Sequence, residues 1–187
     1  MLCPFCQNPL KADAAECPAC RLTFPRASAL VGAMPRLAPV VADTTQQLAA
    51  AEQLKLRKRI AAMQGRFPQL VMQVLMHSFP ADHPFSMHVF WLFNAGNFAG
   101  DSRRGKDNHA LLIAVDPVRG EAAIIPGYGL EPFLKPEILD HLLELAGPAW
   151  EKGRWADGLF SVLDGLDRLL ESIAIPSDTV GGEAGEF

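Results

Sequence analysis

Four cysteines in two short motifs constrain this chain more than any other feature. Cys3-Pro4-Phe5-Cys6 and Cys17-Pro18-Ala19-Cys20 hold all four cysteines of the 187-residue chain. Two C-x-x-C pairs this close together place four thiolates where short loops can fold back onto one tetrahedral ion. The pattern therefore predicts a structural Zn²⁺ site in a small zinc ribbon over residues 1–24, with these ligands: Cys3, Cys6, Cys17 and Cys20.

Two other uses of the cysteines fit the sequence less well. Disulfides need an oxidising compartment, and the first residues show neither the basic nor the apolar segment of a secretory signal. A redox C-x-x-C needs one motif in a βαβ pattern, whereas two copies here flank a polar turn. Because four sulfurs fill a tetrahedral ion, no position stays open for a catalytic water. We expect structural zinc in a cytoplasmic protein.

Hydropathy and charge argue against two kinds of partner. The most apolar segments, 70–79 and 89–93, are shorter than the ~20 residues of a spanning helix, so we expect no membrane insertion. The net charge is −4, and residues 67–174 carry 14 acidic against 8 basic groups. An acidic surface repels phosphate backbones, so duplex nucleic acid is not expected. A protein partner is the expected one.

The remaining residues alternate between helical and strand patterns. Apolar runs predict strands over 70–77, 109–115 and 121–125, with a Pro and Gly turn joining the last two. Periodic leucines, prolines and N-cap residues predict four helices: from Thr44 or Thr45 to Gln64, from Pro84 to Phe93, from Pro136 to Gly147, and over 159–173. This order favours an α/β fold, a three-layer α/β/α sandwich with a small mixed sheet.

Composition also predicts the domain boundaries. Residues 25–42 contain prolines and no regular period, which predicts a linker that leaves the ribbon tethered. Residues 43–175 form the predicted main domain, and the Gly- and Glu-rich residues 176–187 predict a disordered tail. The basic cluster at 57–59 suits a solvated helix end, and a patch for an acidic partner is the alternative.

Two loops at strand ends collect the candidate ligand-binding residues. Residues 100–108 precede the second predicted strand, and Gly-Tyr-Gly-Leu-Glu at 127–131 follows the third. In α/β sheets ligands bind at strand ends. Oxygen ligands for a hard cation such as Ca²⁺ are available there: Asp107, Asn108 and Glu131. The alternative is structural, with Asp107-Asn108 as a turn and with Gly127 and Gly129 supplying positive φ.

Three strings resemble the TPM domain family, which is named partly for a thylakoid-lumen phosphatase. They are Gly-Lys-Asp-Asn at 105–108, Gly-Tyr-Gly-Leu-Glu at 127–131, and the segment 151–159, within a similarity covering roughly residues 55–174. The resemblance implies an α/β/α sandwich, with calcium near both loops in family members and ligand contacts at Gly127, Tyr128 and Gly129. In plant members it also implies a weak acid phosphatase activity.

The sequence departs from the family pattern around these loops. His109 stands where the family usually has glycine, and Arg119 lies in a turn where the family usually begins its third strand with a basic residue. The third strand here ends at Pro126. A structural role for His109 is the simpler interpretation, and donation to a phosphate is the alternative.

Two functions of different classes follow. The preferred hypothesis is a cytoplasmic adaptor whose acidic TPM-like domain contacts a protein partner and carries at most a divalent cation. Its zinc ribbon makes a second contact with a partner. The alternative is a metal-dependent acid-phosphatase-like hydrolase using Ca²⁺ or Mg²⁺, with Asp107 as nucleophile or metal ligand and basic residues holding phosphate: Arg103, Arg104 and Lys106. Phosphoryl transfer also needs an acid for the leaving group, which the sequence does not reveal.

Overall fold

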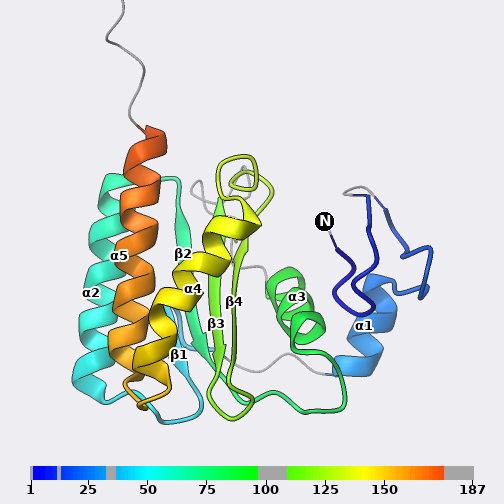
Figure 1. The fold of residues 1–187 in the computed structure, drawn as a ribbon, viewed down its shortest axis with the longest axis horizontal. Helices are drawn as coiled ribbons and strands as arrows, with labels where there is room; N and C mark the ends of the chain where they lie inside the picture. The colour runs from blue at the N-terminus through cyan, green and yellow to red at the C-terminus, as the bar shows by residue number, and fades with distance from the viewer. Residues whose placement is uncertain (1, 12–13, 33–36, 97–108, 175–187) are drawn as a thin grey trace, which may run out of the picture.

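The computed structural model describes residues 2–11, 14–32, 37–96 and 109–174, and it shows a four-stranded sheet between two layers of helices (Figure 1). The strands lie side by side in chain order: β1 (Val41–Asp43), β2 (Val71–Met76), β3 (Ala110–Asp116) and β4 (Glu121–Pro126). The first three run parallel, and β4 pairs antiparallel with β3. The α/β sandwich with a small mixed sheet is confirmed.

Five helices surround this sheet in the described part of the chain: α1 (Phe24–Val31), α2 (Ala50–Arg66), α3 (Phe85–Ala95), α4 (Pro136–Trp150) and α5 (Trp155–Ala174). In Figure 1, α2, α4 and α5 lie on one side of the sheet, and α3 with α1 on the other. All seven residues of β3 are buried because helices cover both faces of this central strand. The three strands expected from apolar runs are confirmed to within a residue or two.

The first helical layer holds the larger hydrophobic core. Leu56, Ile60 and Met63 of α2 are fully buried, and they belong to the same cluster as Leu159 and Leu163 of α5. Burying one such side chain stabilises the fold by about 1.5–3 kcal/mol. The aliphatic stripes predicted for these helices are therefore core, as expected.

The basic cluster near the end of α2 differs from expectation. Arg59 does not extend into solvent but donates to Asp164 (2.7 Å) and Asp167 (2.8 Å) of α5. Arg66 donates to Asp167 and Glu171. The helical pattern of α2 cannot show that a row of carboxylates on α5 lies beside its arginines. These ion pairs join α2 to α5.

The second layer joins the cysteine-bearing N-terminal residues to the sheet. Its core contains Leu75 and Leu112 of the sheet and Val89 and Leu92 of α3, together with the buried cysteines Cys3 and Cys17. Residues 2–23 are called the head from here on. The helix predicted from Pro84 is confirmed as α3, with Pro84 as its N-cap.

The prediction of an unstructured linker over residues 25–42 is wrong. Thr23 caps a short helix there by accepting the N–H of Arg26 (3.3 Å), and Pro25 fits the first helical turn. The indole of Trp91 on α3 donates to Ser28 (3.0 Å), which fixes α1 against the second layer. Residues 41–43 then form β1 beside β2. Eight helical residues are too few to show a clear period, so the prolines suggested a linker.

Three other helix boundaries differ from the predictions. The carboxylate of Asp43 accepts from the N–H groups of Thr45 (2.8 Å) and Leu48 (2.7 Å), and the turn so formed delays the start of α2 to Ala50. Gly65 lies inside α2 and does not end it. Helix α4 likewise continues past Gly147 through Pro148 to Trp150. The predicted disordered tail, 176–187, lies outside the described residues.

Candidate functional site: a four-cysteine centre beside an apolar pocket

The two cysteine motifs fold into matching turns. The N–H of Gln7 donates to the carbonyl of Cys3, and the N–H of Arg21 donates to the carbonyl of Cys17, each at 2.9 Å. Gln7 and Arg21 adopt the left-handed backbone region, with φ of 60° and 56°. Each follows the second cysteine of its motif, so both turns aim their sulfurs in the same way. The internal repeat seen in the sequence is therefore a structural repeat.

The turns bring all four thiols together. Their Sγ atoms lie within 4.8 Å of one another, and the Cys3–Cys20 and Cys6–Cys17 distances are both 3.7 Å. A disulfide would require about 2.05 Å, and the cysteines are free. A tetrahedral ion bound by sulfur at about 2.3 Å separates its ligands by about 3.8 Å. The four cysteines can therefore hold one metal ion.

Asn8 gives the centre a local electrostatic feature. Its side-chain Nδ2 lies 3.4 Å from the Sγ of Cys6. Hydrogen bonds from the side chain and then the backbone of Asn8 lower the pKa of the Cys6 thiol to about 6. A hydrogen bond to sulfur stabilises the thiolate, which is the form that binds metals.

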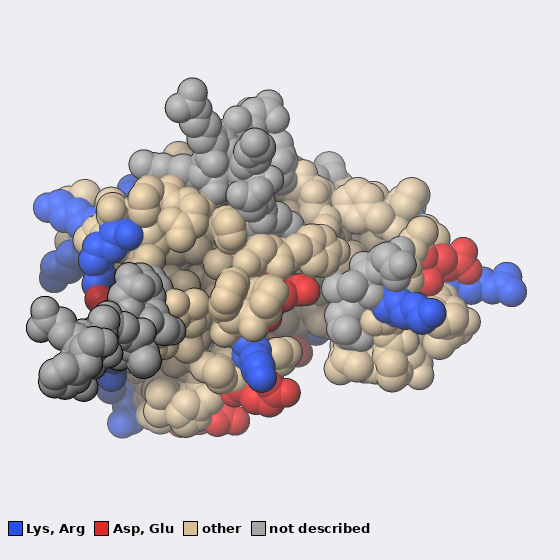
Figure 2. Space-filling view, turned by 90° about the horizontal axis from the view of Figure 1, so that it is seen from above, with Lys and Arg blue, Asp and Glu red and all other residues tan. Residues whose placement is uncertain are grey.

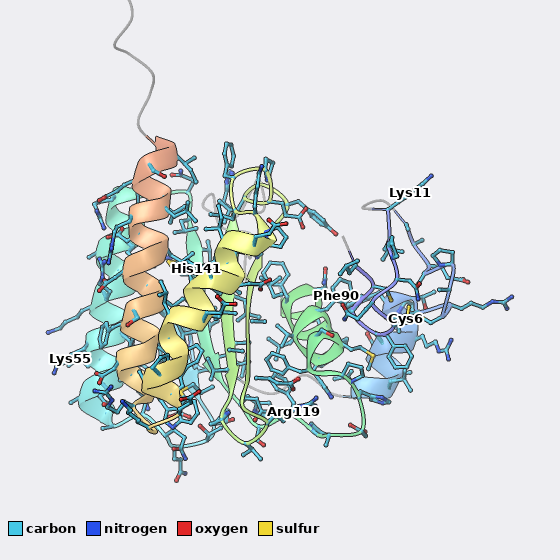
Figure 3. The ribbon with its side chains drawn as sticks, viewed as in Figure 1. Cys6, Lys11, Lys55, Phe90, Arg119 and His141 are labelled. Atoms are coloured by element: carbon cyan, nitrogen blue, oxygen red, sulfur yellow. The ribbon has the colours of Figure 1, made fainter. Side chains whose placement is uncertain are left out.

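The head is docked on α3 and is not the loose tether that the linker interpretation suggested. Ser86, in the first turn of α3, donates to the carbonyl of Pro4 (2.6 Å) and accepts from the side chain of Gln7 (3.3 Å). The ring of Phe5 meets that of His83 edge-on at 6.5 Å. Figure 3 shows Cys6 in the head, near α1 and on the same side of the sheet as α3. The metal centre is thereby fixed to the sheet through one helix.

The Gly-Tyr-Gly-Leu-Glu loop closes the end of β4. The N–H of Gly127 donates to the carbonyl of Ala110 (2.8 Å), and the N–H of Leu130 donates to the carbonyl of Gly127 (2.8 Å). Leu130 is buried, whereas Tyr128 is 53% exposed. The alternative in which Gly127 and Gly129 supply positive φ is wrong, because neither has a positive φ. The loop is anchored by its leucine and presents its tyrosine.

The predicted calcium site is only partly visible. Asp107 and Asn108 lie outside the described residues, as do Arg103, Arg104 and Lys106. Glu131 is exposed in the 127–131 loop, which begins beside the first residue of β3, Ala110. The 127–131 loop therefore borders the end of the sheet at which β3 begins, and its joint binding of a cation with Asp107 and Asn108 stays a prediction. His109 contributes its carbonyl to Val71 of β2 (3.0 Å).

At that end of the sheet the parallel strands β1, β2 and β3 begin and the antiparallel strand β4 ends. Asp43 and Asp116 are the last residues of β1 and β3, at the opposite end of these strands. The carboxylate of Asp116 accepts the N–H of Phe79 (2.8 Å) and the N–H of Val118 (2.9 Å). Both aspartates are thus engaged in holding turns, so ligand binding at the carboxyl ends has no support here.

A pocket of about 430 Å³ lies beside the 127–131 loop. Its walls come from the head, α3, β4, this loop and α4, and they include Leu2, Phe90, Ile125, Tyr128 and Leu139. Figure 3 shows Phe90 on α3 and His141 on α4 on opposite sides of β4. In Figure 2, which looks down on this end of the sheet, uncharged atoms cover much of the face. Most Lys and Arg lie toward its left and right ends, and one basic group lies beside acidic groups in its lower middle.

The sequence predicted part of this pocket and missed the rest. Tyr128 and Glu131 line it as members of the singled-out loop, but Asp140 of α4 and Phe90 of α3 were not predicted. Both lie on helices whose hydrophobic periodicity predicts which residues are buried but not which residues line a pocket. A single exposed aspartate in a leucine-rich helix, such as Asp140, does not by itself indicate a binding site.

Comparisons with known proteins agree with this architecture. No helix among the described residues is long and apolar enough to cross a membrane. The fold is similar to that of an N-terminal domain from P. gingivalis, with a TM-score of 0.62, 19% identity, and coverage of 74% of this chain and 95% of that one. A second N-terminal domain, from Corynebacterium glutamicum, gives a TM-score of 0.53, 17% identity, and coverage of 83% and 99%.

The family assignment rests on the sequence match. No curated protein sequence matches the chain. Residues 41–169, which begin with β1 and end within α5, match the TPM domain, and the four-cysteine head precedes the match. This match spans more than half of the chain, which therefore belongs to the TPM domain family.

Proposed function

We propose that this chain is a protein-interaction module in which a zinc-stabilised head and a TPM domain present one binding surface. The observation that carries the proposal is the composition of the pocket, because Leu2 of the head lines it together with Tyr128 of the domain. Tyr128 and Phe133 are 53% and 51% exposed around the same loop. Exposed aromatic side chains next to an apolar hollow are typical of protein contact sites.

Zinc is the proposed occupant of the cysteine centre. Four sulfur ligands with near-tetrahedral spacing suit Zn²⁺, and a site filled by four thiolates has a structural role. Thiolates persist in reducing compartments, which supports a cytoplasmic location. Elemental analysis should find close to one zinc per chain and much less in Cys17→Ser. Zinc-free protein after gentle purification would contradict this assignment.

The phosphatase alternative has less support from the described residues. Among the residues that the structure describes, the pocket lining contains two carboxylates, Glu131 and Asp140, and no Lys, Arg or His. Such walls repel a phosphate unless a cation offsets their charge. Binding of Ca²⁺ or Mg²⁺ by Asp107, Asn108 and Glu131 remains part of the proposal, because carboxylate and amide oxygens suit those ions.

Affinity purification from cells tests the interaction function. The full chain, tagged at its C-terminus, is compared with Leu2→Asp and with the matched control Leu54→Asp. Leu54 is 52% exposed on α2 and does not line the pocket. The wild type and Leu54→Asp should retain the same protein partner, and Leu2→Asp should lose it. No specific partner, or equal retention by all three proteins, would contradict the proposal.

An activity assay separates the alternative. Purified full chain is incubated with an aryl phosphate and either Ca²⁺ or Mg²⁺, alongside Asp107→Ala. The interaction proposal predicts the same background rate for both proteins. Turnover that depends on the metal and disappears in Asp107→Ala would establish the hydrolase instead.

A further inference from the structure

The outer edge of β4 carries hydrogen-bonding groups without partners in the described structure. Gly127 pairs with Ala110, and strand residues alternate the direction of their backbone groups. Ala122, Ile124 and Pro126 therefore direct their backbone groups away from β3. No described residue bonds to the outward N–H of Ala122 or Ile124. An edge of this kind is a template for one more strand.

The pocket lies across this edge and not on one face of the sheet. Ile124 packs into the first-layer core and Ile125 against the second, and both line the pocket. Phe90 of α3 forms a wall on the side of Ile125, and Leu139 of α4 forms one on the side of Ile124. A strand added here would place alternate side chains against the two walls.

The charge of the pocket restricts the occupant further. Glu131 and Asp140 are its only charged lining residues among those that the structure describes, and both are exposed carboxylates. In a symmetric antiparallel pair with a second copy, these carboxylates, which lie near the carboxyl end of β4, would approach the start of the other β4, where the exposed Glu121 is also acidic. Pro126 also lacks the N–H that it would contribute to a symmetric pair. A basic partner meets neither difficulty.

We infer that β4 accepts an extended segment of a partner protein as a fifth strand of the sheet. This segment carries two adjacent large apolar residues flanked by Lys or Arg. The inference rests on the proposed interaction function and specifies the chemistry of the partner. The segment's backbone pairs with the outward groups of Ala122 and Ile124. One of its two apolar residues contacts the α3 wall of the pocket and the other contacts the α4 wall. Its basic residue faces Glu131 and Asp140.

Selection of peptides on the zinc-loaded full chain tests this inference. A phage-displayed library of random dodecapeptides is enriched on the immobilised protein, and the selected peptides are synthesised with a fluorescent label. Enriched sequences should carry neighbouring large apolar residues beside Lys or Arg. On binding, the amides of Ala122 and Ile124 should become protected from hydrogen exchange.

Matched variants locate the binding site. Ala122→Pro removes an outward N–H and should weaken the selected peptides about fivefold or more, whereas Ala122→Ser keeps that N–H and should bind like the wild type. Asp140→Lys should weaken binding at least about tenfold. Glu144→Lys, one turn further along α4 and outside the pocket lining, should change it little.

Several results would overturn the inference: no enriched sequence, equal binding by all four variants, or protection of amides away from β4. Dimerisation of the free chain that Asp140→Lys disrupts would assign the edge to a second copy instead. If affinity purification still recovers a Leu2-dependent partner while peptides fail, the interaction function stands and only the strand-addition site is removed.

Discussion

Asp167 is the residue that joins α2 to α5. Burial by itself would raise its pKa, but hydrogen bonds from Arg66 and Arg59 and their charges outweigh burial, so the pKa of Asp167 is lowered. A lowered carboxyl pKa stabilises the fold fully above the unfolded pKa of about 4. That contribution is lost as the pH falls through the lower folded pKa.

Asp167→Asn should therefore reduce the free energy of unfolding at pH 7 by about 1–3 kcal/mol, because two arginines lose a partly buried ionic acceptor. Urea denaturation measures the change. Glu171→Gln is the matched control, since Glu171 is more exposed and pairs with Arg66 alone among the described residues. This substitution should cost less than about 1 kcal/mol. Equal effects of the two substitutions would show that Asp167 has no special role.

His88 is a buried histidine on α3 without an evident structural hydrogen bond. It is 2% exposed, and neither ring nitrogen has a hydrogen-bond partner of ordinary geometry among the described residues. Burial lowers the pKa of His88 more than the Asp82 charge and the Pro80 carbonyl raise it. The unfolded chain therefore binds the proton more readily, and stability falls as the pH drops below the unfolded value of about 6.5.

Replacing His88 with Phe should make stability less sensitive to pH. Urea denaturation at pH 7.5 and pH 5.5 should show a smaller loss for His88→Phe than for the wild type. His141→Phe, at a largely exposed position on α4, should keep the wild-type loss. If His88→Phe loses as much stability as the wild type over this interval, His88 does not resist protonation.

At the scale of elements, the α4–α5 pair depends on a close approach at Gly158. A Cβ built on Gly158 would lie 2.1 Å from Nε1 of Trp150, whereas nothing lies within 4 Å of a Cβ at Gly147. The indole of Trp150 also donates to the carbonyl of Trp155 (3.2 Å). The tryptophan is thus held where an added methyl group would collide with it.

Gly158→Ala should destabilise the protein by about 1–3 kcal/mol through this overpacking. The same substitution at Gly147, in the interior of α4, should be neutral or stabilise by up to about 1 kcal/mol, because alanine is the better helix former. Thermal unfolding of both variants measures the difference. A Gly158→Ala protein as stable as Gly147→Ala would show that Trp150 moves aside freely.

Helices and strands with long hydrophobic patterns could be predicted from the sequence. Short elements, and helix ends set by a capping side chain, could not. β3 and the helices α4 and α5 have strong periodic or continuous apolar sequences. β1 has three residues, α1 begins with a proline-containing turn, and the start of α2 depends on the side chain of Asp43. Such features depend on one hydrogen bond or on a neighbouring strand, and no period in the sequence records them.

In the whole molecule, too, one part of the candidate site could be predicted from local sequence and another could not. The cysteine centre was predictable because two local motifs supply all its ligands. The pocket was not, because it forms only where the head, α3, β4 and α4 meet. Ser86 docks the head on α3, so the wall that Leu2 and Phe90 form depends on the head and α3 being assembled together. We propose that metal bound in the head supports this interaction surface.

Hydrogen–deuterium exchange of the full chain, measured with zinc bound and after chelation, tests whether the metal supports the surface. Without zinc, exchange should be faster in the head and in the first turn of α3, which contacts the head through Ser86, while β3 and α5 remain protected. Unchanged exchange throughout, or a change confined to the head, would contradict a zinc-supported surface shared by the head and the TPM domain.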